Sequence, residues 1–84
     1  MASKHNFNQK HYNMIREVYE DLIQKKIKKS YIYRELKNMF AEQIKNKTLR
    51  VFDIMCYYQM IQGKAKTYDE AIRLAGYIAA RRCG

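Results

Sequence analysis

Residues 48–82, TLRVFDIMCYYQMIQGKAKTYDEAIRLAGYIAARR, have the pattern of two helices joined by the segment 63–67, GKAKT. Gly63 suits the left-handed position that ends many helices, because glycine adopts a positive φ at little steric cost. Thr67 and Glu70 have the S/T-x-x-E spacing of a capping box, in which each side chain accepts a hydrogen bond from the other residue's amide. The stretch therefore predicts a helical hairpin, with a wide apolar stripe on its first helix and small residues on its second.

The preceding sequence continues the helical pattern. Apolar residues recur at three- and four-residue steps from Gln9 to the lysine-rich run 25–29, in which the first helix is expected to end, and again from Tyr31 to about Lys45. In the last helix, Gly76 is expected to be a point of close packing against another helix. The residues expected to cap or end helices are Asn8 or Asn6, Ser30 and Thr48 at N-termini, and Asn46 after the second helix.

These features predict an all-α fold, a compact bundle of about four short helices. The chain has 84 residues, no proline and no strand-like alternation of useful length, which indicates a single helical domain over 9–82 after a flexible N-terminus, 1–8. Short connections predict that sequential helices pack antiparallel or as helix-turn-helix corners. A core this small and an apolar stripe on every helix also predict self-association, as a homodimer or a higher oligomer.

Charge is the strongest functional signal in the sequence. Seventeen basic residues face eight acidic ones, for a formal net charge of +9. Such an excess attracts polyanions, of which nucleic acid is the favoured partner, ahead of an acidic protein surface and an anionic membrane; general solubility is the remaining explanation. No apolar run reaches the ~18 residues of a membrane helix, and the first residues lack the apolar core of a signal peptide. We therefore expect no membrane partner and a cytoplasmic, intracellular protein.

The basic residues gather at helix ends and connections. In an up-down bundle, the first and third connections would lie at the same end, and the polar face of the second helix would extend the basic surface. Phosphate contacts of this kind position a protein without reading sequence, and DNA is favoured over RNA as the partner. The predicted nucleic-acid-binding residues are Lys25, Lys26, Lys28, Lys29, Tyr31, Arg34, Lys37, Lys64 and Lys66.

The resulting hypothesis is a small basic helical protein that binds nucleic acid, with an accessory or regulatory role. The alternative is a helical adaptor or inhibitor that docks on an acidic protein surface, such as that of a nucleic-acid-processing enzyme. Eight tyrosines and four methionines, Met14, Met39, Met55 and Met60, suit such an adaptable interface. Tyr33 is assigned to the core rather than to the binding surface.

No catalytic, metal or cofactor site is expected, and the protein is predicted not to be an enzyme. The carboxylates of Glu17, Glu20 and Asp21 lie on neighbouring helical turns beside basic residues, a pattern typical of surface ion pairs. Cys56 is expected to be a buried thiol, and Cys83 a terminal one, with no disulfide between them. The two histidines, six residues apart, do not share a helical face and so do not form a metal pair.

Overall fold

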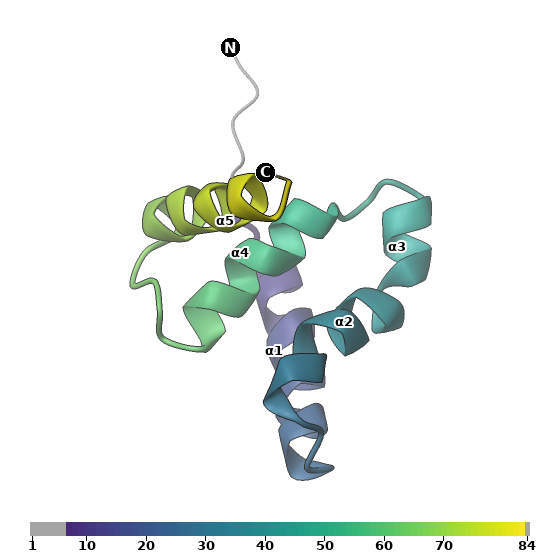
Figure 1. Cartoon of the computed structure of the whole chain (residues 1–84). Coiled ribbons are helices and arrows are strands. Elements are labelled where there is room, and N and C mark those ends of the chain that lie inside the picture. The colour runs from purple at the N-terminus through teal and green to yellow at the C-terminus, as the bar shows by residue number, and fades with distance from the viewer. Residues whose placement is uncertain (1–6, 84) are drawn as a thin grey trace.

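The structure, a computed structural model, describes residues 7–83, with side chains up to Arg81. It is all-α in this range, as predicted (Figure 1). Its radius of gyration of 12.6 Å is close to the roughly 12 Å of a compact chain of this length. The helices are α1 (Gln9–Gln24), α2 (Lys29–Met39), α3 (Ala41–Lys45), α4 (Val51–Ile61) and α5 (Tyr68–Cys83).

Helix α4 is the central element. It packs against α1, α2 and α5, while α3 packs against α2. Because α4 has neighbours on several sides, six consecutive residues, 54–59, are buried in it. In Figure 1, α1 runs down to the turn at the bottom and α2 rises from this turn toward the right; α4 crosses α1 obliquely and α5 lies across the top. The arrangement therefore departs from a simple up-down bundle, which was one of the two arrangements expected from the short connections.

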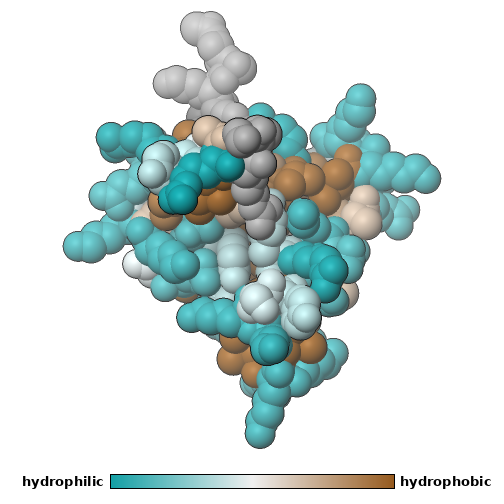
Figure 2. Space-filling view, in the orientation of Figure 1, coloured by the Kyte–Doolittle hydropathy of each residue, from teal (hydrophilic) through white to brown (hydrophobic). Residues whose placement is uncertain are grey.

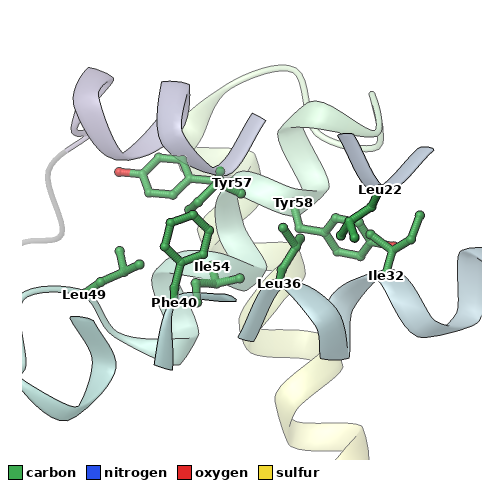
Figure 3. Close-up of a cluster of buried hydrophobic side chains, with 9 residues drawn as sticks. Leu22, Ile32, Leu36, Phe40, Leu49, Ile54, Tyr57 and Tyr58 are labelled. Atoms are coloured by element: carbon green, nitrogen blue, oxygen red, sulfur yellow. The ribbon is translucent and has the colours of Figure 1, made fainter. Parts of the chain in front are cut away.

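The core has two parts, one on each side of α4. The larger part joins α4 to α1 and α2 and includes Ile15, which has no exposed surface. Ile32, Leu36 and Ile54, also fully buried, belong to the same part (Figure 3). The smaller part joins α4 to α5 through Met55, Cys56, Ala65, Ala71 and Ala75. The alanines allow α5 to lie close to α4, as its small residues predicted.

The close-packing role expected for Gly76 is wrong. Gly76 is exposed, and a Cβ built there would have no neighbour within 4 Å. Ala75, one residue earlier, is fully buried instead. One position on a helix is a rotation of about 100°, so the packing face of α5 passes through Ala71 and Ala75 and leaves Gly76 on the solvent side.

The single helix predicted from Tyr31 to Lys45 is divided at Phe40. The backbone of Phe40, at φ −107° and ψ 22°, ends α2 and begins α3. Its side chain is 4% exposed and lies among Leu49, Ile54 and Tyr57 (Figure 3). The break between the two helices accompanies burial of this ring. The spacing of apolar residues around Phe40 does not reveal the break.

Three helices end in the same way, with one residue in the left-handed region. These residues are Lys26 after α1, Lys47 after α3 and Gly63 after α4, with φ of 62°, 65° and 81°. After α1, the amides of Lys26 and Ile27 donate to the carbonyls of Ile23 and Leu22, the pattern of a Schellman motif. The prediction for Gly63 is confirmed, whereas the left-handed residue after α3 is Lys47 rather than Asn46, whose φ is −80°.

The predicted N-terminal caps have mixed outcomes. Asn8 caps α1, since its Oδ1 accepts from the His11 amide at 3.1 Å. Thr67 Oγ1 accepts from the Glu70 amide at 3.1 Å, as the capping box predicts. The reciprocal bond differs, because Glu70 Oε1 accepts from the amide of Lys66 at 2.8 Å instead of that of Thr67. The carboxylate therefore reaches one residue further back than in a standard box.

The other two expected caps are wrong. Ser30 lies inside α2, whose N-cap is Lys28 and has no side-chain cap. Ile27 and Ile32 flank this start and belong to the same core cluster, so apolar packing of the kind called a hydrophobic staple sets where α2 begins. Thr48 donates its hydroxyl to the Gln43 carbonyl at the end of α3. At the start of α4, the Asp53 carboxylate accepts from the amide of Arg50 instead.

Tyr57 holds the start of the described chain against α4 and α5. The amide of Asn8 donates to Tyr57 Oη at 2.9 Å, and the ring of Tyr57 stacks on that of Tyr68 at 5.6 Å. Phe7 meets both rings edge-on at 5.6–5.8 Å. Burial raises the pKa of both tyrosines, which also share a side-chain hydrogen bond. Residues 1–6 of the predicted flexible N-terminus lie outside the described range.

Within residues 7–83, no helix combines the length and the apolar character needed to cross a membrane. Hydrophilic side chains project around the outline of the molecule in Figure 2, with smaller apolar patches between them. The apolar side chains with large exposed fractions include Met39 at 58% and Tyr77 at 62%.

Candidate nucleic-acid interface

The lysine run is held in the short turn between α1 and α2. The left-handed Lys26 reverses the chain, and the half-buried Ile27 anchors the turn to the core. The four lysines of this run, Lys25, Lys26, Lys28 and Lys29, are exposed. Lys25 Nζ forms an ion pair with Asp21 Oδ2 at 3.1 Å, with both side chains more than half exposed. This pair leaves Lys25 less available to phosphate than its neighbours, because a phosphate would have to compete with the carboxylate.

The α1–α2 turn and the α4–α5 connection, for which the sequence predicted a shared basic surface, contribute one lysine each to a common pocket. Lys29, the first residue of α2, and Lys64, between α4 and α5, line the same pocket of about 360 Å³. The walls of this pocket, which we call the α2–α4 pocket, are formed by Lys29, Ser30, Tyr33, Met55, Tyr58, Gln59, Gln62, Lys64 and Ile78.

The other predicted lysines of these connections lie outside those walls. Lys66 is exposed in the α4–α5 connection, where its amide bonds to Glu70. In Figure 1, the α1–α2 turn lies at the bottom and the α4–α5 connection at the left. The six lysines of the two connections are therefore spread over the surface around one shared pair, instead of meeting at one end of a bundle.

The predicted residues on α2 form cation–π pairs. The guanidinium of Arg34 lies 5.0 Å from the ring centre of Tyr31, which is 46% exposed. The ammonium of Lys37 lies 4.6 Å from the ring centre of Tyr33. An exposed tyrosine backed by an arginine offers a base both a stacking surface and a positive charge.

Tyr33 belongs to the core, as its sequence position predicted. It is half-buried, packs against both core clusters and stacks on Tyr58 with ring centres 5.9 Å apart. Burial raises the pKa of Tyr58. The two rings give the α2–α4 pocket an aromatic wall.

Two glutamines of the α2–α4 pocket were not identified from the sequence. Gln59 is 4% exposed, and its Nε2 donates to Met55 Sδ at 3.1 Å. The Oε1 atoms of Gln59 and Gln62 are buried without a hydrogen-bond partner. A buried polar atom without a hydrogen-bond partner lowers the free energy of unfolding by about 1–3 kcal/mol. Such atoms are rare in folded proteins, so these two oxygens call for a physical explanation. One feature of the sequence could have pointed to Gln59: this polar residue follows Met55 by one helical turn and so lies on the apolar side of its helix.

Two of the three α1 carboxylates, those of Glu20 and Asp21, form exposed ion pairs as predicted, whereas Glu17 forms none with a described residue. Arg16 pairs with Glu20 at 3.1 Å, in addition to the pair of Asp21 with Lys25. At the start of α4, Arg50 pairs with Asp53 at 2.8 Å. The hydrogen bonds that the Arg50 guanidinium donates to the Asp53 carboxylate raise the pKa of Arg50. These contacts are structural and bring no carboxylate into the α2–α4 pocket.

Cys56 is a buried thiol, as predicted. It has no exposed surface, and burial raises its pKa from 9.0 to about 12. A thiol that stays protonated at neutral pH is a poor nucleophile and a poor metal ligand. Among the described residues, no three His, Cys, Asp or Glu side chains come together in a group that could hold a metal. His5 and the side chain of Cys83 lie outside the described part.

Comparison of the chain with protein-family models, with curated proteins and with solved structures gave no match. The function must therefore be inferred from the geometry of the chain's own residues.

Proposed function

We propose that this chain is a small nucleic-acid-binding protein with an accessory or regulatory role, which contacts mainly phosphates and favours DNA over RNA. The observation that carries the proposal is the set of exposed lysines around the α2–α4 pocket, whose walls include Lys29 and Lys64. None of Lys26, Lys28, Lys29, Lys64 and Lys66 forms an ion pair with a described residue. Unpaired ammonium groups retain their attraction for phosphate. When they bind it, they displace the counterions condensed on the nucleic acid.

Two features of α2 extend the same surface. Arg34 lies over the ring of Tyr31, and Lys37 lies over the ring of Tyr33. Stacking of a guanidinium on an aromatic ring limits its motion, so less conformational freedom remains to be lost when it contacts a phosphate. The proposed contact surface therefore runs from the α1–α2 turn along the exposed side of α2.

A salt titration followed by fluorescence anisotropy tests the proposal. Each neutralised phosphate contributes about −0.9 to the slope of log affinity against log salt, so a slope of roughly −3 to −5 is expected on duplex DNA. The double variant Lys28→Gln/Lys29→Gln should weaken binding to all sequences alike and make the slope shallower by about 1–2. Lys45→Gln/Lys47→Gln is the matched control, because it removes the same charge at and just after the end of α3 and should change the slope less.

The alternative function is docking on an acidic protein surface. It is favoured by an apolar groove of about 220 Å³ beside α4 and α5, lined by Tyr33, Val51, Phe52, Met55, Ala75 and Ala79. Absence of DNA binding at about 50 mM salt, where phosphate contacts are strong, would reject the nucleic-acid proposal and favour this alternative. Equal effects of the two lysine pairs would show that the overall charge, rather than the proposed surface, drives binding.

A further inference from the structure

We propose that the α2–α4 pocket takes up one unpaired base of the bound nucleic acid and that guanine fits it best. This inference rests on the proposed function, because phosphate binding brings the base to the pocket. It depends on three observations: the volume of the pocket, the two buried amide oxygens that lack a hydrogen-bond partner, and the two lysines on its wall.

The size of the pocket suits a small ligand. Its volume of about 360 Å³ is near the lower end of the roughly 300–1,000 Å³ typical of ligand sites. The aromatic wall of Tyr33 and Tyr58 and the side chains of Met55 and Ile78 offer apolar surface to a flat ring. A nucleotide unit, with an apolar face, a polar edge and a charged phosphate, matches this mixture of side chains.

The amides select for hydrogen-bond donors. Gln59 lies near the end of α4, and Gln62 is the C-cap residue of this helix, with helical φ and ψ. Their spacing of three residues places the two side chains on the same face. Each has a buried Oε1 that lacks a partner. The last torsion of a glutamine has a broad energy profile, so each carboxamide can turn its oxygen toward a ligand. A base edge with two neighbouring donors would then satisfy both oxygens.

Guanine meets this requirement best among the four bases. Its Watson–Crick edge carries an N1–H and an N2 amino group side by side, whereas thymine has one N–H between two acceptors. Proteins that take up an unpaired base read that edge through hydrogen bonds and hold the ring against aromatic or apolar side chains. Lys29 and Lys64 on the same walls supply positive charge for the phosphate of that nucleotide.

Fluorescence anisotropy with duplex DNA tests the inference. Four labelled duplexes each carry one extrahelical guanine, adenine, cytosine or thymine, and a fifth is fully paired. At one salt concentration, the guanine duplex should bind about tenfold more tightly than the paired duplex, the change in affinity expected from satisfying buried acceptors. Thymine should give the smallest gain.

Leucine variants locate the effect. Gln59→Leu and Gln62→Leu remove the acceptors at similar volume and should abolish the preference for guanine. Gln43→Leu is the matched control, because Gln43 also has a buried unpartnered Oε1 but lies outside the pocket walls. It should keep the preference. Thermal melts monitored by circular dichroism verify folding, and removing an unsatisfied buried amide is not expected to lower stability.

The outcomes separate this inference from the function on which it rests. Equal affinity for the guanine and paired duplexes, with salt-dependent binding to both, would overturn the pocket assignment and leave the phosphate-binding proposal intact. A guanine preference that persists in Gln59→Leu and Gln62→Leu would also overturn it. Failure to bind any duplex would overturn both.

Discussion

Lys26 offers a direct test of how the α1–α2 turn is held. Its φ of 62° puts it in the left-handed region, where a residue with a Cβ is disfavoured by about 1–2 kcal/mol. Glycine avoids this strain but loses about 0.5–1 kcal/mol more backbone entropy on folding. The difference predicts that Lys26→Gly is more stable by about 0.5–1 kcal/mol.

The comparison that isolates this effect is Lys26→Gly against Lys26→Gln. Both variants remove the same charge, so changes in self-repulsion and in the interaction with the α1 dipole cancel, and only the side chain beyond Cα differs. For a domain of this size, 1 kcal/mol shifts the melting temperature by about 4–8 °C. The glycine variant should therefore melt about 2–8 °C above the glutamine variant in thermal melts followed by circular dichroism.

Lys25 provides a control of the opposite sign. Its φ is −79°, an ordinary value, so glycine brings no relief there and only loses entropy. Lys25→Gly should be less stable than Lys25→Gln by about 0.5–1 kcal/mol. If Lys26→Gly melts at or below Lys26→Gln, the left-handed turn at Lys26 is not strained and the reasoning from its positive φ is refuted.

Three other predictions follow from local features. Thr67→Ala removes the acceptor of the Glu70 amide and should lower the free energy of unfolding by about 0.5–2 kcal/mol in urea melts, whereas an unchanged midpoint would show that the cap does not stabilise α5. The Cys56 thiol keeps its proton up to a pKa of about 12 in the folded state but loses it near 9.0 when unfolded, so its contribution to stability should be lost as pH rises through that window. Urea melts across the window should show a shallower alkaline decline in Cys56→Ala, and parallel declines would contradict the assignment. We also propose self-association through exposed apolar side chains such as Met39 and Tyr77, so sedimentation equilibrium at micromolar concentration should show a dimer or larger species, and a monomer would refute this.

The helices whose signals are local could be predicted from the sequence. The expected helix beginning at Gln9 matches α1, Gly63 has the positive φ expected of it, and Thr67 accepts the capping hydrogen bond. Each of these depends on a few consecutive residues and on the spacing of apolar side chains. Such signals are present before any tertiary contact forms.

The features that were missed depend on residues far apart in the chain. Phe40 continues the apolar stripe of its helix, and its local spacing gives no sign of the break that accompanies packing beside Leu49 and Ile54. The placement of Lys29 and Lys64 on the same pocket depends on how α4 lies against α2, which the sequence does not reveal. The burial of Gln59 has the same origin, since it depends on how α2 and α5 approach α4.

The central position of α4 has a consequence for how this protein can diverge. A helix buried on one side can exchange every residue of its outer face, but six consecutive positions of α4 have no outer face. Substitutions there must preserve volume on several sides at once, so accepted changes should be few and should come in compensating pairs with residues of α1, α2 and α5. The lysines of the connections have no such restraint and could move along the surface while the charge is kept. A distant relative would thus be recognised more readily by the residues of α4 than by those that carry the charge.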